Sequence, residues 1–130
     1  MSTPIIFSLV ASVVAIVFGG ILAAWVLGRL PGDEKMQEIA KAIQDGSKAY
    51  LNRQYKTIAM VAVVVFFALA FLINWDTAWG FLVGAIFSSI AGYVGMNVAV
   101  RANVRTAHAA SKGVDKAMNV AIRGGAVTGM

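Results

Sequence analysis

The sequence has 130 residues, of which 59% are hydrophobic and only 13% are charged, and its mean hydropathy is +0.77. This charged share is about half of that usual in a soluble domain, so too few polar residues remain to cover a soluble core. The formal net charge is +5 and cysteine is absent, which excludes disulfides, thiolate metal sites and a cysteine nucleophile. Lipid is therefore the expected solvent for most of the surface.

The first apolar run has the length of a membrane span. It contains no charged residue, and we place the span at about 3–28. A cleaved secretory signal peptide is the competing interpretation, but it requires a basic start and an apolar stretch of only roughly 7–15 residues. The sequence therefore predicts a retained transmembrane helix.

Two further apolar runs predict a helical hairpin. We place their spans at about 57–75 and 77–100, near the ~20 residues that a hydrocarbon core about 30 Å thick requires. Polar residues at 74–77 form the expected turn between them. Trp75 and Trp79 flank this turn, where interfacial aromatic residues are expected.

The basic residues predict the orientation of these spans. All 11 Lys and Arg residues lie in two segments, 29–56 and 101–123. The positive-inside rule places both segments in the cytoplasm and the N-terminus outside. An alternative role for these segments, binding of anionic lipid, gives the same topology. We expect a multi-pass protein of the bacterial inner membrane.

An amphipathic cytoplasmic helix is predicted at about 33–56. Asp33 and Glu34 suit the positive end of a helix dipole, and apolar residues then recur at helical spacing. No proline follows, so the helix is free to continue into the second span. The helix could lie flat on the membrane or pack on cytoplasmic extensions of other helices. Its acidic residues would repel anionic lipid, which favours packing.

The third span has a small residue at every fourth position, namely Gly80, Gly84, Ser88 and Gly92. Small residues allow helix backbones to approach closely in lipid, where no hydrophobic force drives helices together. The stripe therefore predicts a surface that packs against neighbouring helices.

Arg101 and Arg105 follow the third span and share one helix face, because they lie one turn apart. Interfacial anchoring is the favoured interpretation. An anion site or a salt bridge to a neighbouring helix is the alternative. His108 has no Cys, Asp or Glu at ligand spacing, so no metal role is expected for it.

The final residues, 124–130, are rich in glycine but lack the Lys and Ser/Thr of a phosphate-binding loop. The start of a fourth span near Gly124 explains them better, and we expect the sequence to be truncated there. The basic tail has no aromatic residues for base stacking, so no nucleic-acid partner is expected. The predicted fold class is all-α, a fragment of a polytopic transmembrane helical bundle with three spans and the start of a fourth.

Four sequence blocks resemble the membrane-bound, ion-translocating inorganic pyrophosphatase family. They are MQEIA at 36–40, AYLNRQY at 49–55, GYVGMNVAVRANVRTA at 92–107 and RGGAVTGM at 123–130. Their order and spacing also match the family. The resemblance covers essentially the whole chain beyond the first span.

This resemblance implies a homodimeric pump whose subunits arrange their spans in two concentric rings. The full-length protein would hydrolyse pyrophosphate with Mg²⁺ at the cytoplasmic side and move protons, or sodium, out of the cytoplasm. The spans of this chain would belong to the outer ring and act as a scaffold. The implied partners are the lipid bilayer, the remaining helices, a second subunit and pyrophosphate.

We assign no catalytic, cofactor-binding or metal-binding residue to this chain. Its 6 acidic residues are not paired at the end of an apolar helix, and the Asp-rich segment of the family is absent. The ligands of Mg²⁺ would lie outside the chain, which would be inactive alone. Arg101 and Arg105 are the first residues to probe, as structural or supporting groups. A non-enzymatic three-span scaffold or accessory subunit is the alternative function.

Overall fold

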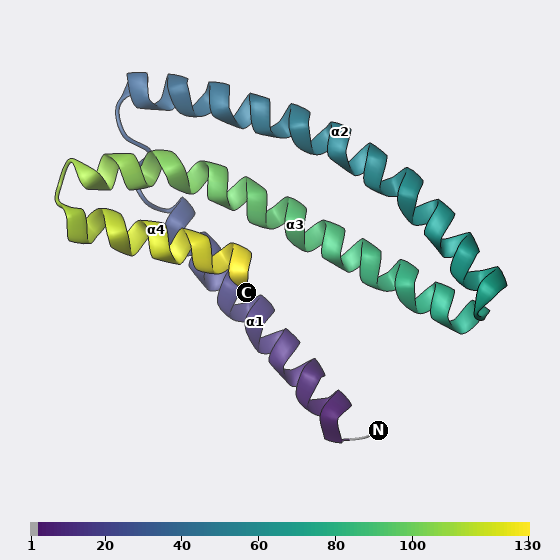
Figure 1. Cartoon of the computed structure of the whole chain (residues 1–130). Coiled ribbons are helices and arrows are strands. Elements are labelled where there is room, and N and C mark those ends of the chain that lie inside the picture. Colours follow the sequence, from purple (N-terminus) through teal and green to yellow (C-terminus); the bar gives the residue numbers. More distant parts are fainter. Residues whose placement is uncertain (1–2) are drawn as a thin grey trace.

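The computed structural model describes residues 3–130, which form four α-helices (Figure 1). In chain order these are α1 (Thr3–Leu27), α2 (Glu34–Leu72), α3 (Trp75–Ala110) and α4 (Val114–Gly129). No strand occurs within this part of the chain, and the predicted all-α class is confirmed. The first three helices are each long and apolar enough to cross a membrane.

The second helix is continuous through the predicted amphipathic helix and the predicted second span. α2 continues for 39 residues, from the amphipathic region through the second apolar run. Its start is set by Asp33, whose Oδ1 accepts a hydrogen bond from the backbone N–H of Met36 at 2.8 Å. Such an N-cap satisfies a donor that has no partner within the helix. No proline interrupts the segment, so its backbone hydrogen bonding continues unbroken.

The second and third helices form a hairpin and lie side by side (Figure 1). α2 ends at Leu72 and α3 begins at Trp75, so Asp76 and Thr77 belong to the first turn of α3 rather than to the connection. The cause is Asn74, whose Oδ1 accepts a hydrogen bond from the N–H of Thr77 at 2.8 Å and caps the helix.

The fourth helix folds back along the last part of α3. The turn before it contains Gly113, whose φ of +127° is strained for residues with a side chain. A Cβ atom added to Gly124 would lie 2.8 Å from the Cβ of Ala102, so glycine permits this close approach. Further along, the hydroxyl of Thr128 donates to the carbonyl of Gly95 at 3.3 Å. Gly124 therefore lies within α4, facing α3.

The first helix packs only by its second half. Its buried residues are Gly19, Leu22 and Val26, and they face α3 and α4. The first half diverges from the other helices (Figure 1), and its large apolar side chains are exposed. Such exposure suits a helix that faces lipid or further protein.

Among the described residues, the small-residue stripe of the third span packs closely against another helix only at its Gly92 end. A Cβ atom at Gly80 or Gly84 would meet nothing within 4 Å, whereas one at Gly92 would lie 2.9 Å from the hydroxyl oxygen of Tyr55. This hydroxyl donates to the carbonyl of Ser89 at 2.8 Å and so ties α2 to α3. In the described structure, the part of the stripe near the hairpin turn is an open surface.

Candidate functional site

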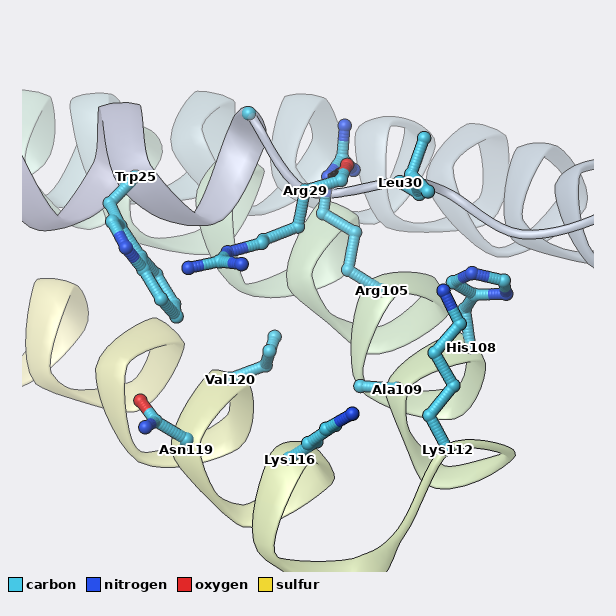
Figure 2. Close-up of a pocket in the computed structure, with 11 residues that line it drawn as sticks. Trp25, Arg29, Leu30, Arg105, His108, Ala109, Lys112, Lys116, Asn119 and Val120 are labelled. Atoms are coloured by element: carbon cyan, nitrogen blue, oxygen red, sulfur yellow. Dashed lines mark hydrogen bonds between the residues drawn. The ribbon is translucent and has the colours of Figure 1, made fainter.

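The end of α1 meets α3 and α4 in a pocket of about 370 Å³, shown in Figure 2. We call it the basic junction. Its basic and aromatic lining consists of Trp25, Arg29, Arg105, His108, Lys112 and Lys116. Trp25 and Arg29 come from the end of α1 and the loop after it, and the other side chains come from α3, the following turn and α4.

Arg105 holds the end of α1 to α3. Because α1 ends at Leu27, its last carbonyl groups have no partners within the helix. The Nη2 of Arg105 donates to the carbonyl of Leu27 at 3.0 Å, and its Nε donates to that of Arg29 at 3.1 Å. We call these two bonds the Arg105 clasp. A third bond, from Nη1 to the carbonyl of Arg101 at 2.8 Å, orients the guanidinium group.

The environment of Arg105 is unfavourable for a cation, yet the charge is retained. Burial lowers the pKa of Arg105 from its ordinary value, and the positive charge of Arg101 lowers it further. An arginine side chain normally titrates far above neutral pH, so the guanidinium group remains cationic. Its charge lies at the negative end of the α1 dipole, where cations are stabilised. The clasp therefore gives Arg105 a structural role.

Trp25 connects α1 to α4 through two guanidinium groups. The Cζ atoms of Arg29 and Arg123 lie 3.8 Å and 4.0 Å from the centre of its ring. Cations within about 6 Å of an indole ring are attracted by its electron-rich face. Because Arg29 follows α1 and Arg123 belongs to α4, this shared ring fixes the two helices to each other.

The basic junction concentrates positive charge. Arg29, Arg105, Lys112 and Lys116 line it, and none of its described lining residues is Asp or Glu. In Figure 2 the side chain of Arg29 extends into the space between α1 and α4, and that of Lys116 extends from α4 towards Ala109. The Nε2 of His108 is buried and has no hydrogen-bond partner within residues 3–130. Such a site attracts anions.

Sequence reasoning treated these cations as topology signals and missed their convergence. One signal was present, because Trp25 and Arg29 are four residues apart at the end of the first span and can share a helix face. The contributions of α3 and α4 depend on how distant helices pack, which local spacing does not reveal. The absence of catalytic and metal-binding residues from this chain stays a prediction.

The fold and the arrangement of charges define an α-helical, multi-pass membrane protein. The model of the inorganic H⁺ pyrophosphatase family matches residues 13–130. The chain belongs to this family, and the resemblance carried by its sequence blocks is confirmed.

Three relatives show how far the similarity extends. A candidate K⁺-stimulated pyrophosphate-energised sodium pump of Clostridium tetani is 47% identical over 130 residues, which are 100% of this chain and 19% of that protein. A K⁺-insensitive pyrophosphate-energised proton pump of Methanosarcina mazei is 49% identical over 122 residues, 92% of this chain and 18% of the relative. The K⁺-insensitive pyrophosphate-energised proton pump 2 of Moorella thermoacetica is 48% identical over 121 residues, 86% of this chain and 18% of the relative. The chain thus spans about a fifth of the length of these relatives.

Proposed function

We propose that this chain is the N-terminal part of a pump that couples hydrolysis of inorganic pyrophosphate to transport of protons or sodium. The observation that carries the proposal is 47% identity over 130 residues to a relative named as a pyrophosphate-energised pump. The family match over residues 13–130 supports it. A non-enzymatic scaffold has less support, since all three relatives above are named as pumps.

Within such a pump, the chain would supply structure rather than chemistry. Mg²⁺ prefers carboxylate and phosphate oxygens, with near-octahedral geometry. Residues 3–130 contain no group of three His, Cys, Asp or Glu side chains that could hold a metal ion, so they do not fit the Mg²⁺ that the family implies. The metal ligands are therefore expected elsewhere in the protein. The contribution of this chain is to fix α1 and α4 to α3, through the Arg105 clasp and the close approach at Gly124.

The proposed topology places the N-terminus outside and the basic segments 29–56 and 101–123 in the cytoplasm. The lengths of α2 and α3, 39 and 36 residues, support it, since about 20 residues suffice to cross the membrane. With the spans placed as expected, the remainder of each helix would carry that helix's own basic residues beyond the membrane, on the same side for both helices. The proposed assembly is a homodimer, as the family resemblance implies.

Ion transport by the complete gene product tests the proposed activity. Inverted membrane vesicles that contain it are expected to acidify internally when pyrophosphate and Mg²⁺ are added. A sodium pump would instead accumulate sodium in the presence of a protonophore. Vesicles without the gene product are the control. If pyrophosphate drives neither proton nor sodium movement, the proposal is wrong.

Cysteine labelling tests the topology separately. This chain contains no cysteine, so a single one can be placed in a gene product whose other cysteines have been replaced. In intact cells, a membrane-impermeant maleimide is expected to label Asp76→Cys and to leave Lys41→Cys unlabelled until the membrane is opened. The reverse pattern would exclude the proposed orientation.

A further inference from the structure

The basic junction contains cations without a counter-charge. Arg105 is used by its clasp, and Arg29 lies over Trp25. Within residues 3–130, the ammonium groups of Lys112 and Lys116 form neither a hydrogen bond nor an ion pair. We propose that the basic junction binds a phosphate group, and that the headgroup of an anionic phospholipid supplies it.

The charge and size of the pocket favour a phosphate group. Four cationic side chains line the pocket and no acidic side chain does, so the mutual repulsion of the cations is relieved when an anion enters. Guanidinium and ammonium groups form strong, charge-assisted hydrogen bonds to phosphate oxygens. The volume of about 370 Å³ lies in the range of small-molecule sites, which is larger than a lone water or halide needs.

The position of the pocket favours a lipid over a soluble anion. It lies where the apolar run of α1 ends, beside Trp25, an aromatic residue suited to the membrane–water interface. Ile21 and Phe18 lie about one and two turns before Trp25, share its helix face and are exposed. They offer an apolar track for acyl chains directly below the charged pocket. Basic pockets between transmembrane helices bind anionic headgroups in this manner.

This inference needs α1 to lie in a membrane, but it does not depend on pumping. It is therefore tested by binding, in the absence of pyrophosphate. The complete gene product is purified in detergent, freed of lipid and titrated with cardiolipin or phosphatidylglycerol. Parallel titrations use phosphatidylcholine or inorganic phosphate at matched ionic strength. The rise in thermal unfolding temperature reports binding of each compound.

Two charge-matched double variants provide the comparison. Lys112→Gln with Lys116→Gln removes the unpaired charges of the pocket and leaves the Arg105 clasp intact. Lys35→Gln with Lys48→Gln removes the same charge from exposed positions of α2 outside the pocket. The first double variant is expected to bind anionic lipid about 25-fold more weakly, since each lysine contributes roughly fivefold. The second double variant is expected to bind as the unchanged protein does.

The outcomes distinguish an anionic lipid headgroup, free inorganic phosphate and the absence of a phosphate site. The proposal is supported if anionic lipid stabilises the protein and phosphatidylcholine does not, and if this stabilisation is lost only in the double variant of Lys112 and Lys116. If inorganic phosphate stabilises the protein as much as anionic lipid does, and the same double variant loses this effect, the pocket binds phosphate but the lipid headgroup is not its source. Stabilisation that is the same in both pairs, or the same with phosphatidylcholine, would overturn the proposal.

Discussion

Replacing Arg105 with glutamine is expected to release the end of α1 from α3. A glutamine side chain is too short to reach both carbonyl groups of the clasp, and it carries no charge at the end of the α1 dipole. The hairpin of α2 and α3 is held by other contacts, such as the hydrogen bond from Tyr55 to the backbone of α3. The perturbation should therefore be local to the connection after α1.

The size of this effect follows from the individual bonds. A hydrogen bond from a charged donor contributes about 1.5–3 kcal/mol when it is buried. The bond to Leu27 is partly buried, whereas the bond to Arg29 is exposed and contributes less. The bond to Arg101 matters little, since that carbonyl lies within α3 and has a helical partner. Loss of the clasp should cost about 2 kcal/mol, which corresponds to roughly 30-fold more frequent opening.

Hydrogen exchange followed by mass spectrometry measures this opening directly. The N–H groups of Gly28 and Arg29 donate to the last turn of α1 at 3.0 Å and 3.1 Å, so their exchange reports fraying there. In Arg105→Gln, a peptide covering 24–32 should exchange about 30-fold faster. Arg101→Gln removes the same charge one turn away without touching the clasp, and should change little. Unchanged exchange in Arg105→Gln, or equal acceleration in both variants, would refute the role of the clasp.

Two further substitutions probe how the other helices hold together. Tyr55→Phe should cost about 1 kcal/mol, because it removes the 2.8 Å hydrogen bond between α2 and α3. Tyr50→Phe at an exposed site is its control, and equal shifts of the unfolding midpoint in SDS would contradict the assignment. Gly124→Ala should destabilise by about 1–3 kcal/mol, since its Cβ would lie 2.8 Å from that of Ala102. Gly125→Ala, where the added atom meets nothing within 4 Å, should instead stabilise by up to about 1 kcal/mol. Shifts of the same sign in both glycine variants would disprove this packing.

Much of the hairpin could be predicted because its determinants are local. Long apolar runs give the helices, the absence of proline keeps α2 continuous, and Asn74 sets the start of α3. The partners of each helix could not be predicted in this way. Small residues at Gly80 and Gly84 look like a packing surface but face open space, whereas α4 packs at Gly124 against Ala102. Spacing shows that a helix can pack closely, and only the fold shows where.

The contacts of the charged residues likewise could not be predicted from local spacing in the sequence. Arg105 lies far in sequence from the carbonyl groups that it binds, and Trp25 meets Arg123 only because α4 folds back towards α1. The positive-inside rule counts these cations without distinguishing their contacts. In the structure, Arg105 caps a helix, Arg123 lies over an indole ring, and Lys116 is left facing an open pocket.

The register of α4 on α3 bears on the proposed fourth span. Gly124 faces Ala102, and the Thr128 hydroxyl bonds to the carbonyl of Gly95. With the third span at about 77–100, as expected from the sequence, Gly124 would lie level with the proposed cytoplasmic end of that span and Thr128 would lie deeper in the membrane. This register supports the expectation that a fourth span begins near Gly124, in which case the first turns of α4 would lie outside the membrane.

Solvent access along α4 tests this depth. In the same cysteine-replaced gene product, Asp115→Cys lies in the first turn of α4 and Thr128→Cys lies near its end. In opened membranes, a hydrophilic maleimide should label Asp115→Cys readily and Thr128→Cys at least tenfold more slowly, because thiols in the hydrocarbon region remain neutral and unreactive. Labelling in denaturant should equalise the two and serves as the control for reactivity. If the two cysteines are labelled at equal rates before denaturant is added, α4 stays in the aqueous phase along its whole length. This result would exclude a span that starts near Gly124.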